Sequence, residues 1–257
     1  MDIRYWNKDL ETLDRSSLKT LQLKLLQETV NWALKTPFYQ RRLGKIGIKS
    51  GDDMRSLEDV LKVPYTTKDD LREAYPTGLL AVPLDDVVRL HTSSGTTGTP
   101  TVVYHTKADL DEWTELTARC IVATGATRKD VFQNMMSYGL FTGGLGLHYG
   151  AEKVGLAIIP AGSGNTARQL RLMKDFQTTT IHATPSYMLH VQSKMAAEGY
   201  TNADLALKRA FTGAESFSAS AHKKIEQLLG IDVYNSYGLS EMNGPGVAFE
   251  CAYKNEM

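Results

Sequence analysis

The sequence predicts an α/β fold in which a mainly parallel sheet is flanked by helices and follows an N-terminal helical portion. From Val87 onward, short runs rich in apolar and β-branched residues alternate with stretches of helical periodicity. Such alternation is typical of a parallel sheet covered by helices on both faces. Before residue 81 the apolar residues follow a helical spacing instead.

The composition is that of an ordinary globular protein. Hydrophobic residues make up 42% of the 257 and charged residues 23%, so one large α/β domain or two small ones can form. Because 29 basic and 29 acidic residues balance, no overall field recruits nucleic acid or an anionic membrane. Cys120 and Cys251 are the only cysteines, which excludes a disulfide scaffold and a CxxC zinc site. With no apolar leader and no run of membrane-spanning length, we expect a cytoplasmic protein.

The helical portion is expected to span residues 1–80. A first helix is predicted over residues 17–35, where apolar residues fall roughly on one face, with Ser16 or Ser17 as its N-cap. Lys35-Thr36-Pro37 is expected to end this helix, and a basic turn to follow it. A second helix is predicted to begin at Thr67, with Asp70 completing the cap. This portion leans on an α/β core over residues 81–257, and the whole is expected to form one domain.

The core is expected to contain seven strands and five helices. The predicted strands span residues 87–91, 101–105, 131–135, 157–160, 179–182, 208–211 and 232–234. The predicted helices span residues 107–122, 143–153, 165–175, 185–198 and 217–229. Thr184-Pro185 is a start signal for the fourth of these helices, since it combines a capping residue with a first-turn proline.

A loop rich in hydroxyl groups lies between the first two strands and reads Ser93-Ser94-Gly95-Thr96-Thr97-Gly98-Thr99-Pro100-Thr101. Its hydroxyls and free backbone amides can wrap around phosphate oxygens, and its glycines allow a close approach. A flexible polar hairpin is the structural alternative. The loop is not of the GxxxxGK[ST] type, because that pattern is absent.

Two further motifs follow predicted strands. Tyr237-Gly238-Leu239-Ser240-Glu241 offers a flat ring, a hydroxyl and a carboxylate that suits Mg²⁺ bound to phosphates. Phe211-Thr212-Gly213-Ala214-Glu215 combines a glycine, which permits close contact with a planar ligand, and a second carboxylate. Since open α/β sheets bind ligands beyond the carboxyl ends of their strands, both motifs are candidates for one crevice.

The order of the motifs closely resembles that of the phenylacetate–coenzyme A ligases, a family of adenylate-forming enzymes. The resemblance runs from Tyr5 to Cys251 and rests on four segments, which span residues 64–72, 90–101, 138–146 and 237–248. Many members of the superfamily carry lysine where Thr101 stands, whereas threonine is usual in the phenylacetate branch. The resemblance implies the fold of the N-terminal domain of an adenylate-forming enzyme.

Site residues are carried over from this resemblance position by position. The residues implied to bind ATP or AMP are Ser93, Ser94, Gly95, Thr96, Thr97, Gly98, Thr99, Gly213, Ala214, Glu215, Asn235, Ser236, Tyr237, Gly238 and Ser240. Those implied to bind the aryl acid are Tyr138, Phe141, Gly143 and Ala214. Thr97 and Glu241 are the implied catalytic residues, and Glu241 is also the implied Mg²⁺ ligand.

The implied reaction is ATP-dependent activation of an aryl-acetic acid to an acyl-adenylate, followed by transfer to coenzyme A, as in aromatic-acid degradation. ATP, Mg²⁺ and coenzyme A are the implied cofactors and co-substrates. Nucleic acid and membranes are not expected partners, and the sequence leaves open whether the protein forms a homodimer. The family continues into a C-terminal domain that supplies a lysine, so we expect 257 residues to be incomplete for turnover. A nucleotide-binding fragment without turnover and a domain that loads a carrier protein remain alternatives.

Other patterns do not support a different site. Gly144-Leu145-Gly146 and Gly162-Ser163-Gly164 fail to complete a dinucleotide-binding GxGxxG, and Ser94 lacks a GxSxG elbow. The six histidines show no metal-ligand spacing. Cys251 could bind a metal in a longer chain, although an isolated thiol is the more common case.

Overall fold

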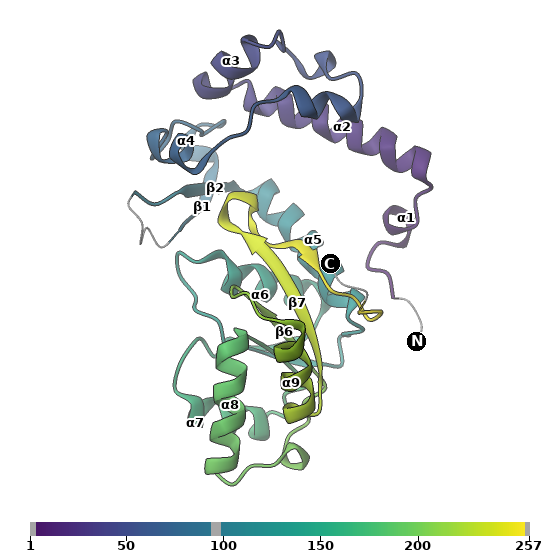
Figure 1. Cartoon of the computed structure of the whole chain (residues 1–257), viewed down its shortest axis with the longest axis vertical. Helices are drawn as coiled ribbons and strands as arrows, with labels where there is room; N and C mark the ends of the chain where they lie inside the picture. Colours follow the sequence, from purple (N-terminus) through teal and green to yellow (C-terminus); the bar gives the residue numbers. More distant parts are fainter. Residues whose placement is uncertain (1–3, 94–98, 255–257) are drawn as a thin grey trace. The chain divides into compact units, whose positions relative to one another are not determined.

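The computed structural model describes residues 4–93 and 99–254 (Figure 1). The chain forms two compact units, one made of Asn7–Lys107 and the other of Met1–Trp6 with Ala108–Met257. The two strands expected at residues 87–91 and 101–105 therefore belong to the same unit as most of the helical portion.

The unit Asn7–Lys107 contains four α-helices, α1 (Lys8–Glu11), α2 (Arg15–Ala33), α3 (Pro37–Gly44) and α4 (Lys68–Glu73), among its described residues. The 3-10 turns η1 (Gly51–Asp53), η2 (Leu57–Lys62) and η3 (Leu84–Asp86) connect them to one another and to the strands. A small core holds the unit together through Val30, Leu43, Ile48 and Met54.

Two of the helix boundaries expected in this unit were wrong. Asp14, and not Ser16 or Ser17, caps α2, because its Oδ1 accepts hydrogen bonds from both serine N–H groups at 2.9 and 3.0 Å. A carboxylate there also interacts favourably with the positive end of the helix dipole. The basic turn expected after Pro37 is helix α3, since a proline capped by Thr36 starts a helix as readily as it ends one.

The cap of α4 and the strand pair are confirmed. Thr67 Oγ1 accepts from Asp70 N at 3.2 Å, and Asp70 Oδ2 accepts from Thr67 N at 2.7 Å, which completes a capping box. Strands β1 (Val87–Thr92) and β2 (Val102–Thr106) pair antiparallel in a sheet of their own. The pairing continues toward the hydroxyl-rich loop, because Ser93 N donates to Thr101 O and Thr101 N to Ser93 Oγ, both at 3.0 Å.

The second unit is built on a six-stranded sheet of order β4-β3-β5-β6-β7-β8, which confirms the predicted fold class. The strands are β3 (Val131–Asn134), β4 (Ala157–Ile159), β5 (Thr180–Ala183), β6 (Arg209–Gly213), β7 (Asp232–Leu239) and β8 (Gly244–Phe249). All neighbouring pairs are parallel except β7 and β8. Strand β8 was not expected, because it begins Gly-Pro-Gly, and such residues weigh against strands away from sheet edges.

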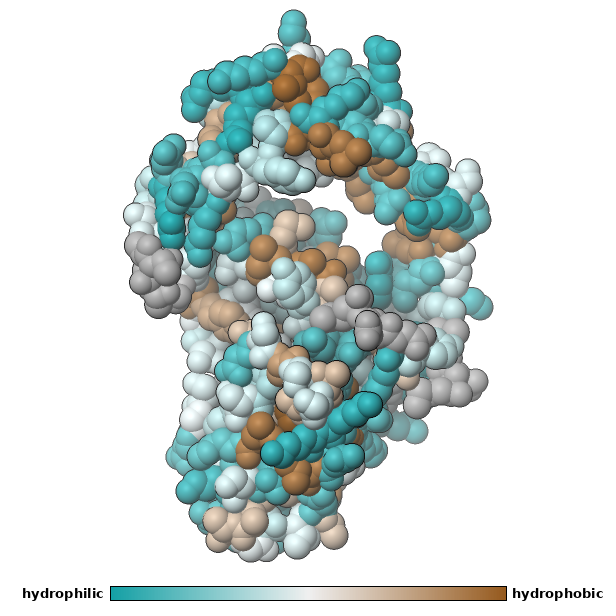
Figure 2. All heavy atoms as spheres, viewed as in Figure 1, coloured by the Kyte–Doolittle hydropathy of each residue, from teal (hydrophilic) through white to brown (hydrophobic). Residues whose placement is uncertain are grey.

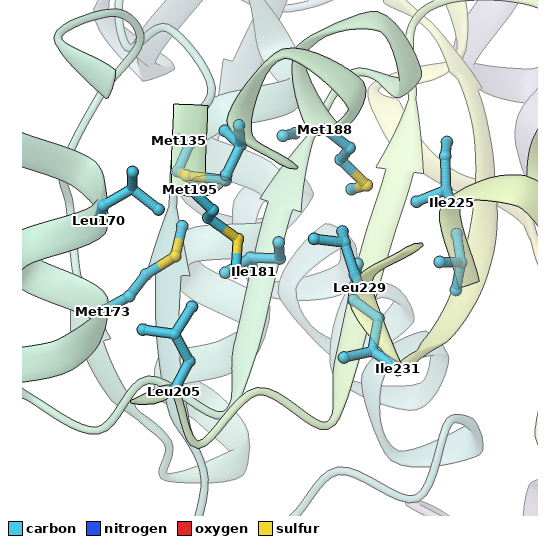
Figure 3. Close-up of a cluster of buried hydrophobic side chains, with 14 residues drawn as sticks. Met135, Leu170, Met173, Ile181, Met188, Met195, Leu205, Ile225, Leu229 and Ile231 are labelled. Carbon is cyan, nitrogen blue, oxygen red and sulfur yellow. The ribbon is translucent and has the colours of Figure 1, made fainter. Parts of the chain in front are cut away.

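Five helices connect the strands: α5 (Lys107–Ala123), α6 (Thr142–Val154), α7 (Thr166–Asp175), α8 (Pro185–Ala197) and α9 (Ala219–Leu229). Thr184 caps α8 and Pro185 opens it, as predicted. Successive residues of a strand face opposite sides, so each strand supplies two cores. One core joins Phe132, Phe211 and Tyr234 to α5 and α6. The other joins the opposite face to α7, α8 and α9, with four methionines among its side chains (Figure 3).

Hydrophilic side chains, in teal, are interspersed with brown hydrophobic ones on the face drawn in Figure 2. Across residues 4–93 and 99–254, no helix combines the length and the apolar character that crossing a membrane requires.

Candidate functional site

A cavity of about 220 Å³ opens at the carboxyl ends of β5, β6 and β7, within the unit that contains the six-stranded sheet. Its walls come from Met136, Phe141, Thr142, Gly143, His182, Gly213, Ala214, Ser236, Gly238, Leu239, Ser240, Gly244 and Pro245. These residues are spread over more than a hundred positions of the chain and meet because parallel strands end at the same edge of the sheet.

The ends of β6 and β7 form one wall of the cavity. Gly213 lies opposite Ser236 in the parallel register, and a Cβ on Gly213 would overlap the carbonyl oxygen of Ser236. Only glycine therefore allows the two strand ends to approach so closely. Ala214 follows with a φ of +66°, a left-handed conformation that turns the chain sharply away from the strand. The backbone at this turn lies open to the cavity, which suits contact with a planar ligand.

A second part of the cavity wall comes from the start of α6. Phe141 is the N-cap of this helix, and Thr142 and Gly143 form its first turn. The turn is held in place by Asn134, whose Nδ2 donates to Gly144 O at 2.7 Å from the end of β3. Since Phe141 presents an aromatic ring with 40% of its surface exposed, this wall can pack against an apolar group of a ligand.

The connection between β7 and β8 closes the third side. Gly238 lies opposite Pro245 and Leu239 opposite Gly244 in the antiparallel register, and a Cβ on Gly238 would overlap the Gly244 carbonyl oxygen. Ser240 begins the single turn η5 (Ser240–Met242) between the two strands. Trp113 of α5 fixes β8 from behind, because its Nε1 donates to Pro245 O at 2.8 Å.

The cavity brings together seven of the residues that the sequence singled out. Gly213, Ala214, Ser236, Gly238 and Ser240, expected at the nucleotide, share the cavity with Phe141 and Gly143, expected at the acid. Five others do not line it: Tyr138, Glu215, Asn235, Tyr237 and Glu241. Ser93 and Thr99 belong to the unit Asn7–Lys107, and Ser94, Gly95, Thr96, Thr97 and Gly98 lie outside the described residues.

Glu215 and Tyr138 lie off the cavity wall, and each contacts another side chain through a polar group. Glu215 accepts hydrogen bonds from Ser186 N at 3.2 Å and Ser186 Oγ at 2.8 Å, so its carboxylate satisfies the N-terminus of α8. Tyr138 places its hydroxyl 3.1 Å from His148 Nδ1, and burial raises the pKa of Tyr138 to about 12. Its phenol is therefore neutral at physiological pH and available as a hydrogen-bond donor.

The other three lie along β7 and its following turn. Asn235 uses its backbone N–H to donate to Glu250 Oε2 at 2.6 Å. Tyr237 is 53% exposed, so its ring offers a flat surface to a ligand outside the cavity wall. Glu241 is exposed and directly follows Ser240, which lines the cavity.

Sequence reasoning missed six residues of the wall: Met136, Thr142, His182, Leu239, Gly244 and Pro245. His182 could have been identified, because it is a polar residue at the carboxyl end of a predicted buried strand. In the sequence it is one of six histidines that show no metal-ligand spacing. Gly244 and Pro245 belong to the segment 237–248 that carries the resemblance, but they were not placed at the site, since strand β8 was not predicted.

Within the part of the chain that the structure describes, no group of three or more His, Cys, Asp or Glu side chains could hold a metal ion. Mg²⁺ does not need such a group, because it usually keeps several waters and binds one or two carboxylates together with substrate phosphates. An exposed carboxylate next to the cavity, as Glu241 provides, is compatible with that mode.

The parallel sheet with a ligand-sized cavity at its carboxyl edge defines an α/β ligand-binding domain. The sequence model of the family described as "AMP-binding enzyme" matches residues 36–256, and the chain belongs to this family. This confirms the adenylate-forming resemblance deduced from the motifs.

Curated relatives point to one branch of that family. The chain is 44% identical over 247 residues to phenylacetate-coenzyme A ligase of Pseudomonas putida, in a match that covers 94% of this chain and 56% of that protein. It is 43% identical over 251 residues to the enzyme of the same name from Escherichia coli (strain K12), in a match that covers 95% of this chain and 57% of that protein. The chain thus spans about half the length of the curated relatives it matches.

A solved structure supports the fold. The crystal structure of 2-hydroxyisobutyryl-CoA ligase in complex with 2-HIB-AMP and CoA matches with a TM-score of 0.91 and 27% sequence identity. This match covers 98% of the present chain and 55% of the other.

Proposed function

We propose that this chain is the ATP- and acid-binding part of a phenylacetate–coenzyme A ligase. The observation that carries the proposal is the shared cavity, which is lined both by the glycine-containing ends of β6 and β7 and by the aromatic start of α6. One wall suits a planar nucleotide base and the other an aromatic acid. The names and the identity of the curated relatives support the same activity.

The proposed reaction has two steps. A carboxylate oxygen of the acid attacks the α-phosphorus of ATP, which forms an acyl-adenylate and releases pyrophosphate. The thiol of coenzyme A then attacks the acyl carbon, forms the thioester and releases AMP. The first step gives the acyl carbon AMP as a good leaving group in place of the poor one of a free carboxylate. The protein therefore has mainly to position the reactants and to stabilise the charge on phosphorus.

The residues divide between the nucleotide and the acid. On the nucleotide side, Gly213 and Ala214 contact the adenine through their open backbone, and Ser240 donates to the α-phosphate. On the acid side, Phe141 packs against the aromatic ring of the acid. Gly143 leaves the space in which the Phe141 ring lies, since a Cβ on Gly143 would overlap that ring. We retain the assignment of the loop from Ser93 to Thr99, including Thr97, to the ATP phosphates on the basis of the resemblance alone.

We further propose that Glu241 holds the Mg²⁺ that accompanies the polyphosphate. A single carboxylate would suit this role, since Mg²⁺ usually binds one or two carboxylates together with substrate phosphates. The ion supplies charge neutralisation at the phosphates. Because ATP and coenzyme A are cytoplasmic metabolites, we place the protein in the cytoplasm.

The test is a calorimetric titration of the AMP-loaded chain with phenylacetate, benzoate, hexanoate and acetate. We expect phenylacetate to bind best and acetate least, since the ring adds buried apolar surface. The margin over benzoate is the smallest, because one methylene in an apolar pocket is worth about 1–3 kcal/mol. Tighter binding of hexanoate than of phenylacetate would remove the aromatic-acid assignment, and a chain that binds no AMP would remove the nucleotide assignment.

A domain that loads a carrier protein would share this cavity. The ligase and the carrier-loading function are separated with a protein of the relatives' full length. It is supplied with the purified acyl-adenylate and coenzyme A, and the thioester formed is measured by mass spectrometry. Thioester formation dependent on coenzyme A supports the ligase. Its absence, with transfer to a carrier protein, supports the alternative.

A further inference from the structure

Asn134, at the end of β3, has its side-chain amide fixed by two backbone groups. Its Nδ2 donates to Gly144 O at 2.7 Å, and its Oδ1 accepts from Met136 N at 3.2 Å. Exchanging the amide nitrogen and oxygen of Asn134 would place a donor against the Met136 N–H and an acceptor against the Gly144 carbonyl. The orientation of the amide is therefore determined by its surroundings.

The fixed amide determines the tautomer of His182. Nδ1 of His182 lies 3.1 Å from Asn134 Oδ1, which is an acceptor, so Nδ1 carries the proton and donates it. The ring stacks on Phe132 with an interplanar angle of 22°. Burial lowers the pKa of His182 to about 3, so the imidazole stays neutral at physiological pH. Its Nε2 is consequently unprotonated and can only accept a hydrogen bond.

The contacts of His182 connect this acceptor to the residues expected at the acid. His182 lines the cavity, and Asn134, which occupies its Nδ1, lies opposite it in the pairing of β3 with β5. The same Asn134 holds the first turn of α6, whose residues Phe141 and Gly143 form the acid wall. A buried acceptor in a pocket lined by Met136 and Phe141 favours a ligand that brings a donor, since an unpaired polar group there costs free energy.

We propose that His182 is a specificity-determining residue whose Nε2 accepts a hydrogen bond from a hydroxyl group on the ring of the bound acid. The substrate class is then a ring-hydroxylated arylacetic acid, in preference to unsubstituted phenylacetate. This inference rests on the proposed function, because it takes the cavity to bind an aromatic acid beside AMP. A hydroxylated acid gives Nε2 of His182 a hydrogen-bond donor, whereas phenylacetate leaves it without one. Sites built around a hydrogen bond reject analogues that lack the partner.

The experiment compares phenylacetate with its three ring-hydroxylated isomers by titration into the AMP-loaded chain. We expect at least one isomer to bind roughly fivefold more tightly than phenylacetate, as one hydrogen bond allows. His182→Phe removes the acceptor and keeps an aromatic ring on Phe132, so the four acids should bind with affinities within about twofold of one another. AMP affinity is measured for both proteins, so that a general loss of binding in the cavity is distinguished from a loss of the preference among the acids. His190→Phe, on the exposed face of α8, is the matched control and should keep the preference.

A second measurement does not depend on the folding of a variant. In ¹⁵N NMR of the wild-type chain, His182 should show a protonated Nδ1, an unprotonated Nε2 and no titration between about pH 5 and pH 8. The Nε2 resonance should shift when the preferred hydroxylated acid binds, and much less with phenylacetate. A protonated Nε2, or phenylacetate binding as tightly as every hydroxylated isomer, would overturn the inference. If no aromatic acid binds at all, the proposed function fails instead.

Discussion

Asp130 and Arg209 form an ion pair at the amino-terminal edge of the six-stranded sheet, with Oδ1 and Nη1 2.9 Å apart. Asp130 directly precedes β3, and Arg209 is the first residue of β6. Thr179, which precedes β5 between them, donates its hydroxyl to the same carboxylate at 2.9 Å. One buried carboxylate thus ties the starts of three neighbouring strands together. The cavity lies at the other ends of these strands, so stability and binding depend on opposite edges of the sheet.

Replacing Asp130 by asparagine should destabilise the protein without changing AMP affinity. The substitution leaves Arg209 without its counter-charge, and removing one partner of a buried ion pair costs about 3 kcal/mol. Urea unfolding followed by circular dichroism measures this loss at pH 7. An unchanged free energy of unfolding would mean that the ion pair contributes nothing.

The same pair predicts a dependence on pH. Burial raises the pKa of Asp130, but the Thr127 N–H, the Arg209 guanidinium and the Thr179 hydroxyl together hold it below its ordinary value of 3.8. A lowered pKa stabilises the folded state above pH 3.8, and this contribution disappears as the pH falls through the folded-state value. The difference in unfolding free energy between wild type and Asp130→Asn should therefore shrink below that pH.

Gly238→Ala should destabilise the sheet edge beside the cavity. Its new methyl would overlap the Gly244 carbonyl oxygen, and β7 and β8 would have to separate, at a cost of about 2 kcal/mol. Gly44→Ala is the control, because a Cβ there meets nothing within 4 Å and the residue ends helix α3. Thermal unfolding should give a lower midpoint for the first variant only. Equal midpoints would show that β8 can move away freely.

Glu241→Gln tests the proposed magnesium ligand. The variant should bind Mg·ATP roughly tenfold more weakly, or about 1.4 kcal/mol, and bind AMP almost unchanged, since AMP carries no bridged polyphosphate. Glu198→Gln, at the exposed end of α8, serves as the control. Calorimetric titration with both nucleotides provides the comparison. Equal losses for Mg·ATP and AMP would assign Glu241 a structural role.

The double substitution Thr96→Val and Thr97→Val tests the proposed phosphate loop. Valine keeps the bulk of threonine and removes two hydroxyl donors, so ATP affinity should fall by roughly tenfold or more. Thr29→Val, on the exposed surface of α2, should have no effect. If ATP binds to the double variant as it does to the wild type, the phosphates are held elsewhere.

Local signals in the sequence determined most of the fold. The alternation of strand-like and helical stretches predicted seven of the eight strands found among the described residues, because apolar periodicity reflects which faces are buried. Thr67 and Thr184 marked helix starts correctly, since capping depends on neighbouring residues alone. Motif order was enough to indicate the family, which the match over residues 36–256 confirms.

Tertiary structure decided what meets at the cavity. Strand β8 forms only because β7 offers an edge with which it can pair, a contact that no periodicity in Gly244-Pro245-Gly246 signals. His182 looked like one of six ordinary histidines until the pairing of β3 with β5 placed it beside Asn134 and on the cavity wall. Its fixed tautomer depends on residues about fifty positions away. A sequence specifies which side chains are present, whereas the surroundings that control their protons exist only after the chain has folded.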